Sequence, residues 1–151
     1  MKEEIQALEE NGTWTTEDLP PGKKAIGCKW IYNIKYNSDG CIERHKARLV
    51  IHGNIQVKGV DYNETFSPAT KMVTVRTFLA SAAAKNSQLH QMDVRNAFLH
   101  GDMEEEVYMK FPPGFEKQSS GKVFRLRKSL YGLTQAPRCW FAKFFGCLEK
   151  L

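Results

Sequence analysis

The sequence contains no apolar run of the roughly 18 residues that a membrane-spanning helix requires. Its longest stretch of small apolar residues, 78–84, falls far short of that length and contains Ser81. Lys2, Glu3 and Glu4 stand near the N-terminus, and no apolar segment follows them as it would in a secretion signal. These absences predict no membrane segment and a protein that is intracellular and not secreted, in a compartment that the sequence does not specify.

Cysteine pairs of the kind that bind zinc or carry out redox chemistry are absent as well. The four cysteines stand at positions 28, 41, 139 and 147, and no two have the spacing of a Cys-x-x-Cys motif. This argues against zinc fingers and redox-active disulfides. Free thiols in a reducing compartment, acting as small buried apolar side chains, are the simpler interpretation.

Charge is present but unevenly distributed along the 151 residues, whose formal net charge is +5. Residues 1–20 hold one cation and six anions, and residues 61–120 hold six cations and eight anions. Residues 21–60 hold eight cations and two anions, and residues 121–151 hold seven cations and one anion. Two basic blocks around an acidic middle fit a protein that binds a polyanion beside a carboxylate. Solvated lysines on strand edges would give the same distribution.

The apolar pattern predicts one α+β domain with antiparallel strands and flanking helices. Helices are expected at residues 2–10 and 74–86 and, from Pro137, at the end of the chain. Strands are expected at three further segments: 89–94, 107–109 and 123–126. Thr74 is the expected N-cap of the middle helix, with Phe78, Leu79 and Ala82 facing inward; Trp140, Phe144, Leu148 and Leu151 line the last helix.

The clearest local prediction is a β-hairpin of residues 25–36 and 41–51, joined by the turn sequence Asn-Ser-Asp-Gly. If Tyr36 pairs with Cys41, alternation divides the hairpin into an apolar face and a cationic face. A bulge near the turn would shift that pairing. The apolar face would hold Cys28, Trp30, Tyr32, Ile34, Ala47, Leu49 and Ile51; the cationic face would hold Lys29, Lys35, Arg44, Lys46 and Arg48.

Asp93 is the strongest candidate for chemistry, because it closes the strand-like segment 89–93 and is followed by Ala97 and Phe98. A carboxylate at the exit of a strand can hold a metal ion beside a nucleotide. Such a site needs more than one carboxylate, and no two of the five aspartates are adjacent. The three glutamates at 104–106 are a poor substitute, because they stand beside a turn and are expected to be solvated.

Ten short segments, taken in order, resemble the reverse transcriptase domain of copia-type retrotransposons. Any one of them is weak evidence, whereas the full series is specific and covers nearly the whole chain. The segments are EEIQAL (3–8), NGTW (11–14), GCKW (27–30), KARLV (46–50), DYNETFSP (61–68), DV (93–94), NAFLHG (96–101), EVYM (106–109), PPGF (112–115) and SLYGLTQAPR (129–138). The family usually carries a lysine where Thr134 stands.

The resemblance implies a right-hand polymerase fold, with the fingers first and an incomplete palm after them. It divides the chain into residues 1–88, an N-terminal helix with a fingers-like region, and residues 89–151, a partial palm. It also implies RNA-directed DNA polymerase chemistry with two Mg²⁺ ions, a template-primer of RNA or DNA, and deoxynucleoside triphosphates. Asp93 would be the catalytic metal ligand, and the carbonyl of Val94 would be a second ligand.

The same resemblance implies the nucleotide contacts. Lys46 and Arg48 match cations of the fingers that contact the incoming triphosphate, although which of the two reaches phosphate is left open. Phe98 matches a ring packed under the sugar, where its bulk disfavours a ribose 2′-hydroxyl, and it can equally be a core aromatic. Tyr131, Gly132 and Gln135 match a palm loop against template and nucleotide, with a turn-forming role as the alternative.

The family's two other metal carboxylates lie in a Tyr-x-Asp-Asp hairpin that these 151 residues do not contain. The sequence therefore predicts a segment of a reverse transcriptase that is inactive alone and is completed by further polyprotein or by a second chain. The alternatives are a basic module that binds nucleic acid without catalysis, and a relic with no function.

Overall fold

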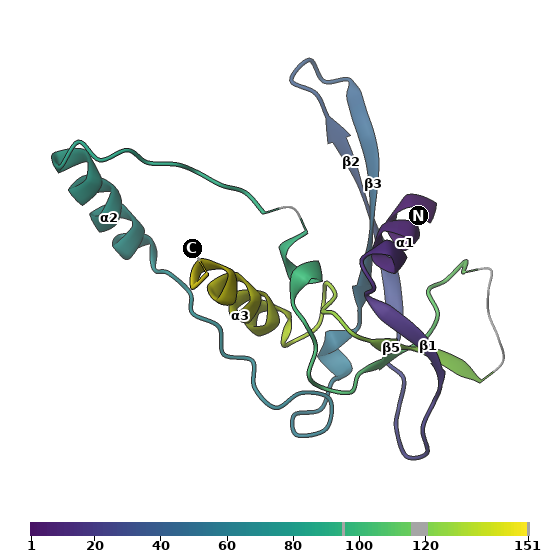
Figure 1. Ribbon diagram of the computed structural model, residues 1–151. Helices are drawn as coiled ribbons and strands as arrows, with labels where there is room; N and C mark the ends of the chain where they lie inside the picture. The colour runs from purple at the N-terminus through teal and green to yellow at the C-terminus, as the bar shows by residue number, and fades with distance from the viewer. Residues whose placement is uncertain (95, 116–120, 151) are drawn as a thin grey trace.

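The computed structural model describes residues 1–94, 96–115 and 121–150, and Figure 1 shows an antiparallel body with two helices to one side. The helices are α1 (Lys2–Glu10), α2 (Met72–Ala84) and α3 (Ala136–Leu148), with short 3₁₀ helices η1 (Gly53–Ile55) and η2 (Ala97–His100). The strands are β1 (Trp14–Asp18), β2 (Cys28–Tyr36), β3 (Ile42–Ile51), β4 (Tyr108–Met109) and β5 (Lys122–Leu126).

Strands from both ends of the chain meet in a three-stranded antiparallel sheet with the order β1-β5-β4. The expected short strands near 107–109 and 123–126 are confirmed, whereas β1 was not predicted. It pairs along its whole length with β5, from Trp14 opposite Leu126 to Asp18 opposite Lys122. The sheet therefore joins residues on both sides of position 88, and the division into fingers and palm stays a prediction.

The main core lies between this sheet, helix α1 and the base of the β2–β3 hairpin. Phe124 is its centre, because its ring stacks on Trp14 with centroids 4.5 Å apart and meets the edge of Phe111 at 4.7 Å. Helix α1 contributes Leu8, which is almost fully buried, and β3 contributes Leu49 and Ile51. Burial of these apolar side chains is the principal stabilising contribution to the body.

The β2–β3 hairpin is confirmed, but the expected pairing of Tyr36 with Cys41 is wrong. Tyr36 lies opposite Ile42, and a bulge between Lys35 and Tyr36 shifts the rest of the ladder so that Cys28 pairs with Ile51. Each β2 residue from Cys28 to Lys35 therefore pairs with a residue of β3 two positions further along the chain than expected. Because side chains alternate between the two faces, a shift of two positions leaves each one on its predicted face. Only the base of the apolar face is buried, because the distal half of the hairpin projects from the body (Figure 1).

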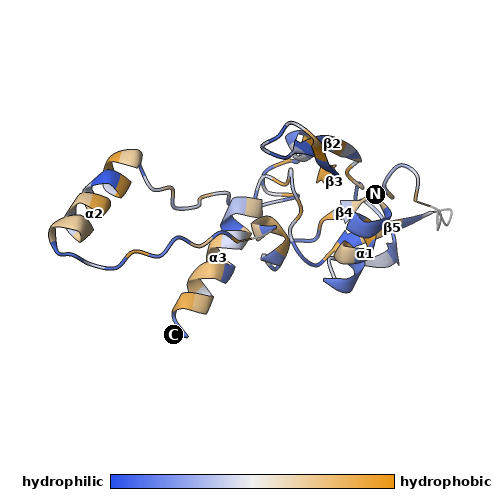
Figure 2. Ribbon diagram, turned by 90° about the horizontal axis from the view of Figure 1, so that it is seen from above, coloured by the Kyte–Doolittle hydropathy of each residue, from blue (hydrophilic) through white to orange (hydrophobic). Residues whose placement is uncertain are grey.

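Helix α2 differs from its prediction in its cap and in its burial. It begins at Met72 after Lys71, whose backbone is extended, so Thr74 lies inside the first turn and is not the N-cap. Phe78 and Leu79, expected to face inward, are 63% and 46% exposed, and only Ala82 is buried. Figures 1 and 2 show the reason, since α2 stands apart from the body at the end of two long extended segments and packs on no sheet.

Residues 89–94 do not form the expected buried strand. The segment is irregular, and Leu89, Met92 and Val94 are exposed. Its sequence has the composition of a strand, but no strand among the described residues pairs with it, so its backbone groups are left to water. Asp93 therefore lies on an extended, solvent-facing segment.

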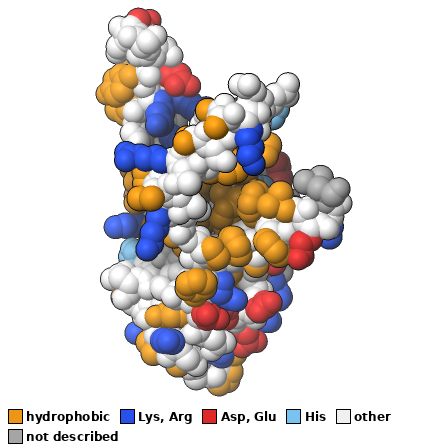
Figure 3. All heavy atoms as spheres, turned by 90° about the vertical axis from the view of Figure 1, so that its left-hand side faces the viewer, with side chains coloured by type: hydrophobic (Ala, Val, Ile, Leu, Met, Phe, Trp, Pro, Cys, Tyr) orange, Lys and Arg blue, Asp and Glu red, His pale blue; other side chains and the backbone are white. Residues whose placement is uncertain are grey.

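Helix α3 begins as predicted, with Pro137 in its first turn. Cys139 is buried and Trp140 half-buried, whereas Phe144 and Leu148, expected to line an apolar face, remain exposed; Leu151 lies outside the described residues. Exposed apolar side chains of α2 and α3 contribute to the hydrophobic area at the centre of Figure 3, and lysine and arginine side chains lie along its edge.

Antiparallel strand pairs combined with helices confirm the α+β class; the right-hand polymerase shape stays a prediction. All four cysteines are free. Within the described ranges, no helix has both the length and the apolar composition needed to cross a lipid bilayer.

Candidate nucleotide-binding cavity

One cavity gathers most of the residues that the sequence singled out. Its volume is about 510 Å³, and its lining comes from β3, from the segment that leads into η2, and from the loop before α3. These segments are far apart in the chain. The predicted site residues that line it are Lys46, Arg48, Asp93, Val94, Phe98 and Tyr131; the others are Arg44, Asn96 and Ala97.

The cationic wall of the cavity follows from strand alternation. Arg44, Lys46 and Arg48 lie on one face of β3, every second residue. Burial lowers the pKa of the Lys46 ammonium, and the positive charges of Arg48 and Arg44 lower it further. Neither Lys46 nor Arg48 has a carboxylate within ion-pair distance among the described residues. An anion that entered the cavity would relieve this repulsion.

Arg44 belongs to this wall, although it was predicted only for the cationic face of the hairpin and not for the site. Its guanidinium lies 3.5 Å from the carboxylate of Glu43. The signal that finds it is the same period of two that relates Lys46 to Arg48. Asn96 and Ala97 were also missed as lining residues, and they lie there because η2 starts at the cavity.

Phe98 is held at the cavity by the backbone around it. Asn96 has a left-handed conformation with φ of +53° and starts the turn, and the amide of Leu99 donates to its carbonyl. The Ser129 hydroxyl donates to the carbonyl of Phe98, and the Asn11 side chain donates to that of Leu99. The Phe98 ring is half-buried against the main core and also lines the cavity, so the core role is confirmed and the sugar contact stays a prediction.

Tyr131 connects the two sides of the cavity. The Arg48 guanidinium carbon lies 5.0 Å from the centre of the Tyr131 ring, a cation–π distance. The Tyr131 ring also makes a T-shaped contact with the Phe98 ring, with centroids 5.6 Å apart and planes at 83°. The aromatic residue between a cation and a second ring thus joins β3 to η2.

Gly132 stands at a position that leaves no room for a side chain. The group that lies against it is the backbone of β3 and not a nucleotide. The φ of Gly132 is +94°, and a Cβ atom there would lie 2.3 Å from the carbonyl oxygen of Ile51. Ile51 in turn donates its amide to the carbonyl of Tyr131 at 2.9 Å. Gly132 does not line the cavity, and its predicted contact with a nucleotide stays a prediction.

Gln135 also lies away from the cavity lining, because its side chain is fully buried. Its amide nitrogen donates to the carbonyl of Asp61 at 3.2 Å, and its oxygen accepts from the Gln56 side chain at 3.0 Å. Thr134 donates to the Gln56 oxygen and to the carbonyl of Gly53. These bonds tie η1 to the start of α3, and no spacing in the sequence signals them. A nucleotide contact by Gln135 stays a prediction.

The carboxylate side of the cavity is sparse. Asp93 is exposed, and in the described part of the chain no three His, Cys, Asp or Glu side chains gather where they could hold a metal ion. The Asp93 carboxylate and the Val94 carbonyl are oxygen donors of the kind Mg²⁺ prefers. They are too few to fix the ion and balance its charge, so the described residues do not form a complete magnesium site.

The glutamates at 104–106 correct another expectation. Glu105 is not solvated: its side chain is only 9% exposed and forms an ion pair with Arg138 on α3. One oxygen of this carboxylate and the Nε atom of Arg138 are buried and have no hydrogen-bond partner among the described residues. The pair fastens the segment before β4 to α3, so Glu105 is committed to the structure and does not face the cavity.

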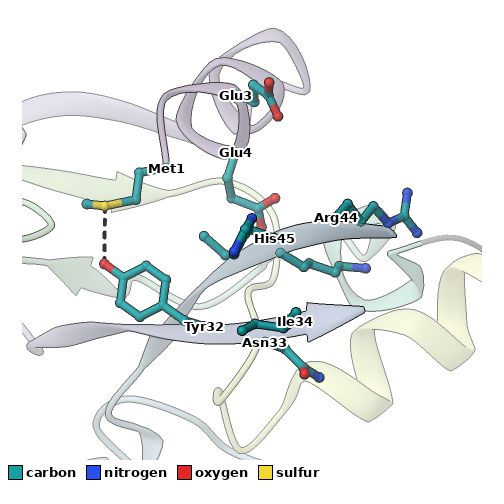
Figure 4. Close-up of a pocket in the computed structure, with 10 residues that line it drawn as sticks. Met1, Glu3, Glu4, Tyr32, Asn33, Ile34, Arg44 and His45 are labelled. Carbon is teal, nitrogen blue, oxygen red and sulfur yellow. Dashed lines mark hydrogen bonds between the residues drawn. The ribbon is translucent and has the colours of Figure 1, made fainter. Parts of the chain in front are cut away.

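A second hollow, of about 570 Å³, lies between α1 and the hairpin (Figure 4). Glu4 points from α1 toward β3 beside His45, and the Tyr32 hydroxyl donates to the sulfur of Met1 at 3.1 Å. Burial raises the pKa of Glu4, while the charges of Lys46 and Arg48 act against that rise. The Glu4 carboxylate therefore interacts with Lys46 and Arg48 of the cationic wall, and it lies on the side of β3 opposite the cavity.

Comparisons of the sequence with known proteins identify its family. The family model described as Reverse transcriptase (RNA-dependent DNA polymerase) matches residues 11–151. The chain is 50% identical over 147 residues to the Retrovirus-related Pol polyprotein from transposon TNT 1-94 of Nicotiana tabacum, covering 95% of this chain and 11% of that protein. It is 48% identical over 145 residues to the corresponding polyprotein from transposon RE1 of Arabidopsis thaliana, covering 95% and 10%.

A more distant relative is the Transposon Ty1-ER2 Gag-Pol polyprotein of Saccharomyces cerevisiae, 33% identical over 158 residues, with 97% of this chain and 8% of that protein covered. No solved structure matches the chain. The chain spans about a tenth of the length of the plant polyproteins it matches. By sequence, then, this chain belongs to the reverse transcriptase family, in the form found in copia-type retrotransposons.

Proposed function

We propose that the chain forms the fingers and the first part of the palm of an RNA-directed DNA polymerase, and that its cavity receives the incoming deoxynucleoside triphosphate. The observation that carries this is the meeting in one cavity of a cationic strand, an aromatic ring and Asp93. A deoxynucleoside triphosphate offers a complementary group to each of the three: a polyanionic triphosphate for the cations, a sugar for the ring, and phosphate oxygens for a metal ion that Asp93 would help to hold.

The roles follow from the side chains. Lys46 and Arg48 offer positive charge to the phosphate oxygens without competition from a paired carboxylate. Phe98 presents an aromatic ring to the sugar, and Asp93 would supply one oxygen ligand to a magnesium ion, which would stabilise the negative charge of the phosphates. Two-metal nucleotidyl transfer needs further carboxylates, and we propose that other parts of the polyprotein, or a second chain, bring them.

Equilibrium binding of dTTP to the 151-residue protein tests the nucleotide site. Lys46→Gln combined with Arg48→Gln should weaken binding by at least about tenfold, since even one hydrogen bond from a charged side chain to phosphate contributes about 1.5–3 kcal/mol. Lys143→Gln is the matched control, because it removes a cation from α3 that is paired with Asp102. Equal losses in the two variants would contradict the site, as would no binding at all.

The same protein, without other polypeptides, should incorporate no deoxynucleotide on a homopolymer template-primer with added Mg²⁺. One carboxylate cannot hold two cations against their mutual repulsion. Incorporation above that of a sample carrying Asp93→Asn would show that the 151 residues complete the metal site by themselves, contrary to the proposal.

A second candidate function is non-catalytic binding of nucleic acid by the cationic face of the hairpin. Lys29, Lys35, Arg44, Lys46 and Arg48 point from this face, and Lys29 and Lys35 lie outside the nucleotide cavity. Fluorescence anisotropy with an RNA–DNA hybrid should show binding that falls steeply with salt, because phosphate neutralisation releases counterions. Lys29→Gln with Lys35→Gln should reduce hybrid binding and leave dTTP binding unchanged; unaltered hybrid binding would exclude this face.

A further inference from the structure

Three side chains from separate parts of the chain form a continuous stack at the cavity wall. Arg48 on β3 lies over the Tyr131 ring, and that ring meets Phe98 on η2 in a T-shaped contact. Arg48 and Phe98 are the residues proposed to touch phosphate and sugar. Tyr131 is in contact with both.

The position of the Tyr131 ring is itself fixed from the backbone. Its carbonyl accepts the amide of Ile51, and the next residue, Gly132, packs directly on the Ile51 carbonyl. Leu130 and Leu133, on either side, are buried in the main core. The ring therefore keeps a constant place relative to the strand that carries Arg48.

A guanidinium stacked on a ring uses its flat face and leaves its N–H edges free. Those edges bind phosphate oxygens in pairs, a geometry that an ammonium group cannot offer. Lys46 lies two residues away on the same face of β3 but has no ring contact and no ion pair within the described residues. A lysine side chain without such a contact has more rotamers to lose when it binds an anion than an arginine already held by a ring.

Resting on the nucleotide site proposed above, we infer that Tyr131 is a positioning residue that holds Arg48 in place for the triphosphate, and that Arg48 is the principal phosphate-binding side chain while Lys46 is secondary. In this role Tyr131 acts through Arg48 and needs no contact of its own with the nucleotide. Its ring aligns Phe98 as well, so phosphate and sugar contacts are set by one side chain.

Calorimetric binding of inorganic tripolyphosphate and of dTTP to the 151-residue protein tests this. Arg48→Gln should weaken both ligands at least about tenfold, because it removes the charged phosphate contact itself. Tyr131→Leu should weaken both about fivefold, the loss expected for one exposed cation–π contact. Tyr131→Phe keeps the ring and should bind as the unchanged protein does. Lys46→Gln should cost less than twofold, about half a kcal/mol or less on the scale of binding constants.

The two changes should not add. Protein carrying both Arg48→Gln and Tyr131→Leu should bind tripolyphosphate as Arg48→Gln alone does, because the ring acts only through the guanidinium. Additive losses would show a separate contact and overturn the inference. Arg48→Gln against Lys46→Gln tests the ranking of the cations without any change at Tyr131; a larger loss for Lys46→Gln would overturn it.

Proton NMR of the protein without ligand distinguishes a positioning role of Tyr131 from a general loss of structure in the variant. The Nε–H proton of Arg48 should resonate upfield through the ring current of Tyr131, keep that shift in Tyr131→Phe and lose it in Tyr131→Leu. An unshifted proton in the unchanged protein would overturn the inference. If the protein binds no triphosphate at all, the proposed nucleotide site falls and the inference with it. If it binds but Tyr131→Leu binds equally well, only the inference falls.

Discussion

Replacing Gly132 by alanine should destabilise the fold strongly, because two separate costs meet at this position. Its φ of +94° lies in the left-handed region and beyond the narrow range that L residues reach there. Left-handed backbone costs an L residue roughly 1–2 kcal/mol. The new Cβ would stand 2.3 Å from the Ile51 oxygen, a backbone atom that cannot turn aside, and such overpacking costs about 1–3 kcal/mol.

Together these costs come to about 3 kcal/mol or more, a large part of the roughly 5–15 kcal/mol that stabilises an ordinary domain. Urea unfolding followed by tryptophan fluorescence measures the loss. With a slope of about 2 kcal/mol per molar urea, the midpoint of Gly132→Ala should fall by roughly 1.5 M.

Gly12→Ala is the matched control. Gly12 also has a positive φ, +63°, at the end of α1, but a Cβ there would meet no atom within 4 Å. Only the conformational cost remains, so its midpoint should fall by about 0.5 M. Equal shifts for the two variants would refute the close contact between Gly132 and Ile51, and no shift in either would refute the backbone conformations themselves.

Three other outcomes follow from the described geometry. Burial raises the pKa of Cys28 to about 11, so at pH 8 iodoacetamide should modify Cys41 and Cys147, which are exposed, long before Cys28, as mass spectrometry can follow. Burial raises the pKa of Glu4 in the folded protein, so its ionised carboxylate costs stability as pH rises above the ordinary value of 4.5. Glu4→Gln should therefore be more stable than the unchanged protein at pH 7 and equally stable well below pH 4.5, in urea titrations at both pH values. Phe98→Val should reduce the preference for dTTP over the ribonucleotide by about tenfold in equilibrium binding, the effect of a small steric change in a pocket; an unchanged ratio would remove Phe98 from the sugar contact.

Local features of the fold could be predicted because they depend on neighbours in the sequence. Helix α1 and the hairpin turn are of this kind, and the cationic face of β3 follows from alternation alone. The predicted pairing of Tyr36 was wrong because a bulge changes the ladder without a clear sequence signal. The two faces of the hairpin were still predicted correctly, because a shift of two residues in the pairing does not change the face on which a side chain lies.

Burial could not be predicted in the same way, since it depends on what packs against an element. Phe78 and residues 89–94 have the composition of a core helix and a core strand, yet no described element covers them. Glu105 shows the opposite error. It stands in a charged segment expected to be exposed, but it is buried by its ion pair with Arg138, 33 positions away. β1 was missed for the same reason, because its partner β5 lies more than a hundred positions along the chain.

The two halves of the proposed site differ in how firmly the chain holds them. The phosphate and sugar half rests on β3, the Tyr131 ring and η2, which backbone hydrogen bonds and the close contact at Gly132 lock to one another. The metal half rests on Asp93, in an exposed segment with no paired strand. Anion binding needs only the first half, whereas metal binding needs Asp93 ordered together with further carboxylates, so phosphate recognition and metal recognition are separable properties of this chain. A strand that paired with residues 89–94 would bury the apolar side chains of this segment and hold Asp93 firmly beside the cationic wall that it already faces across the cavity.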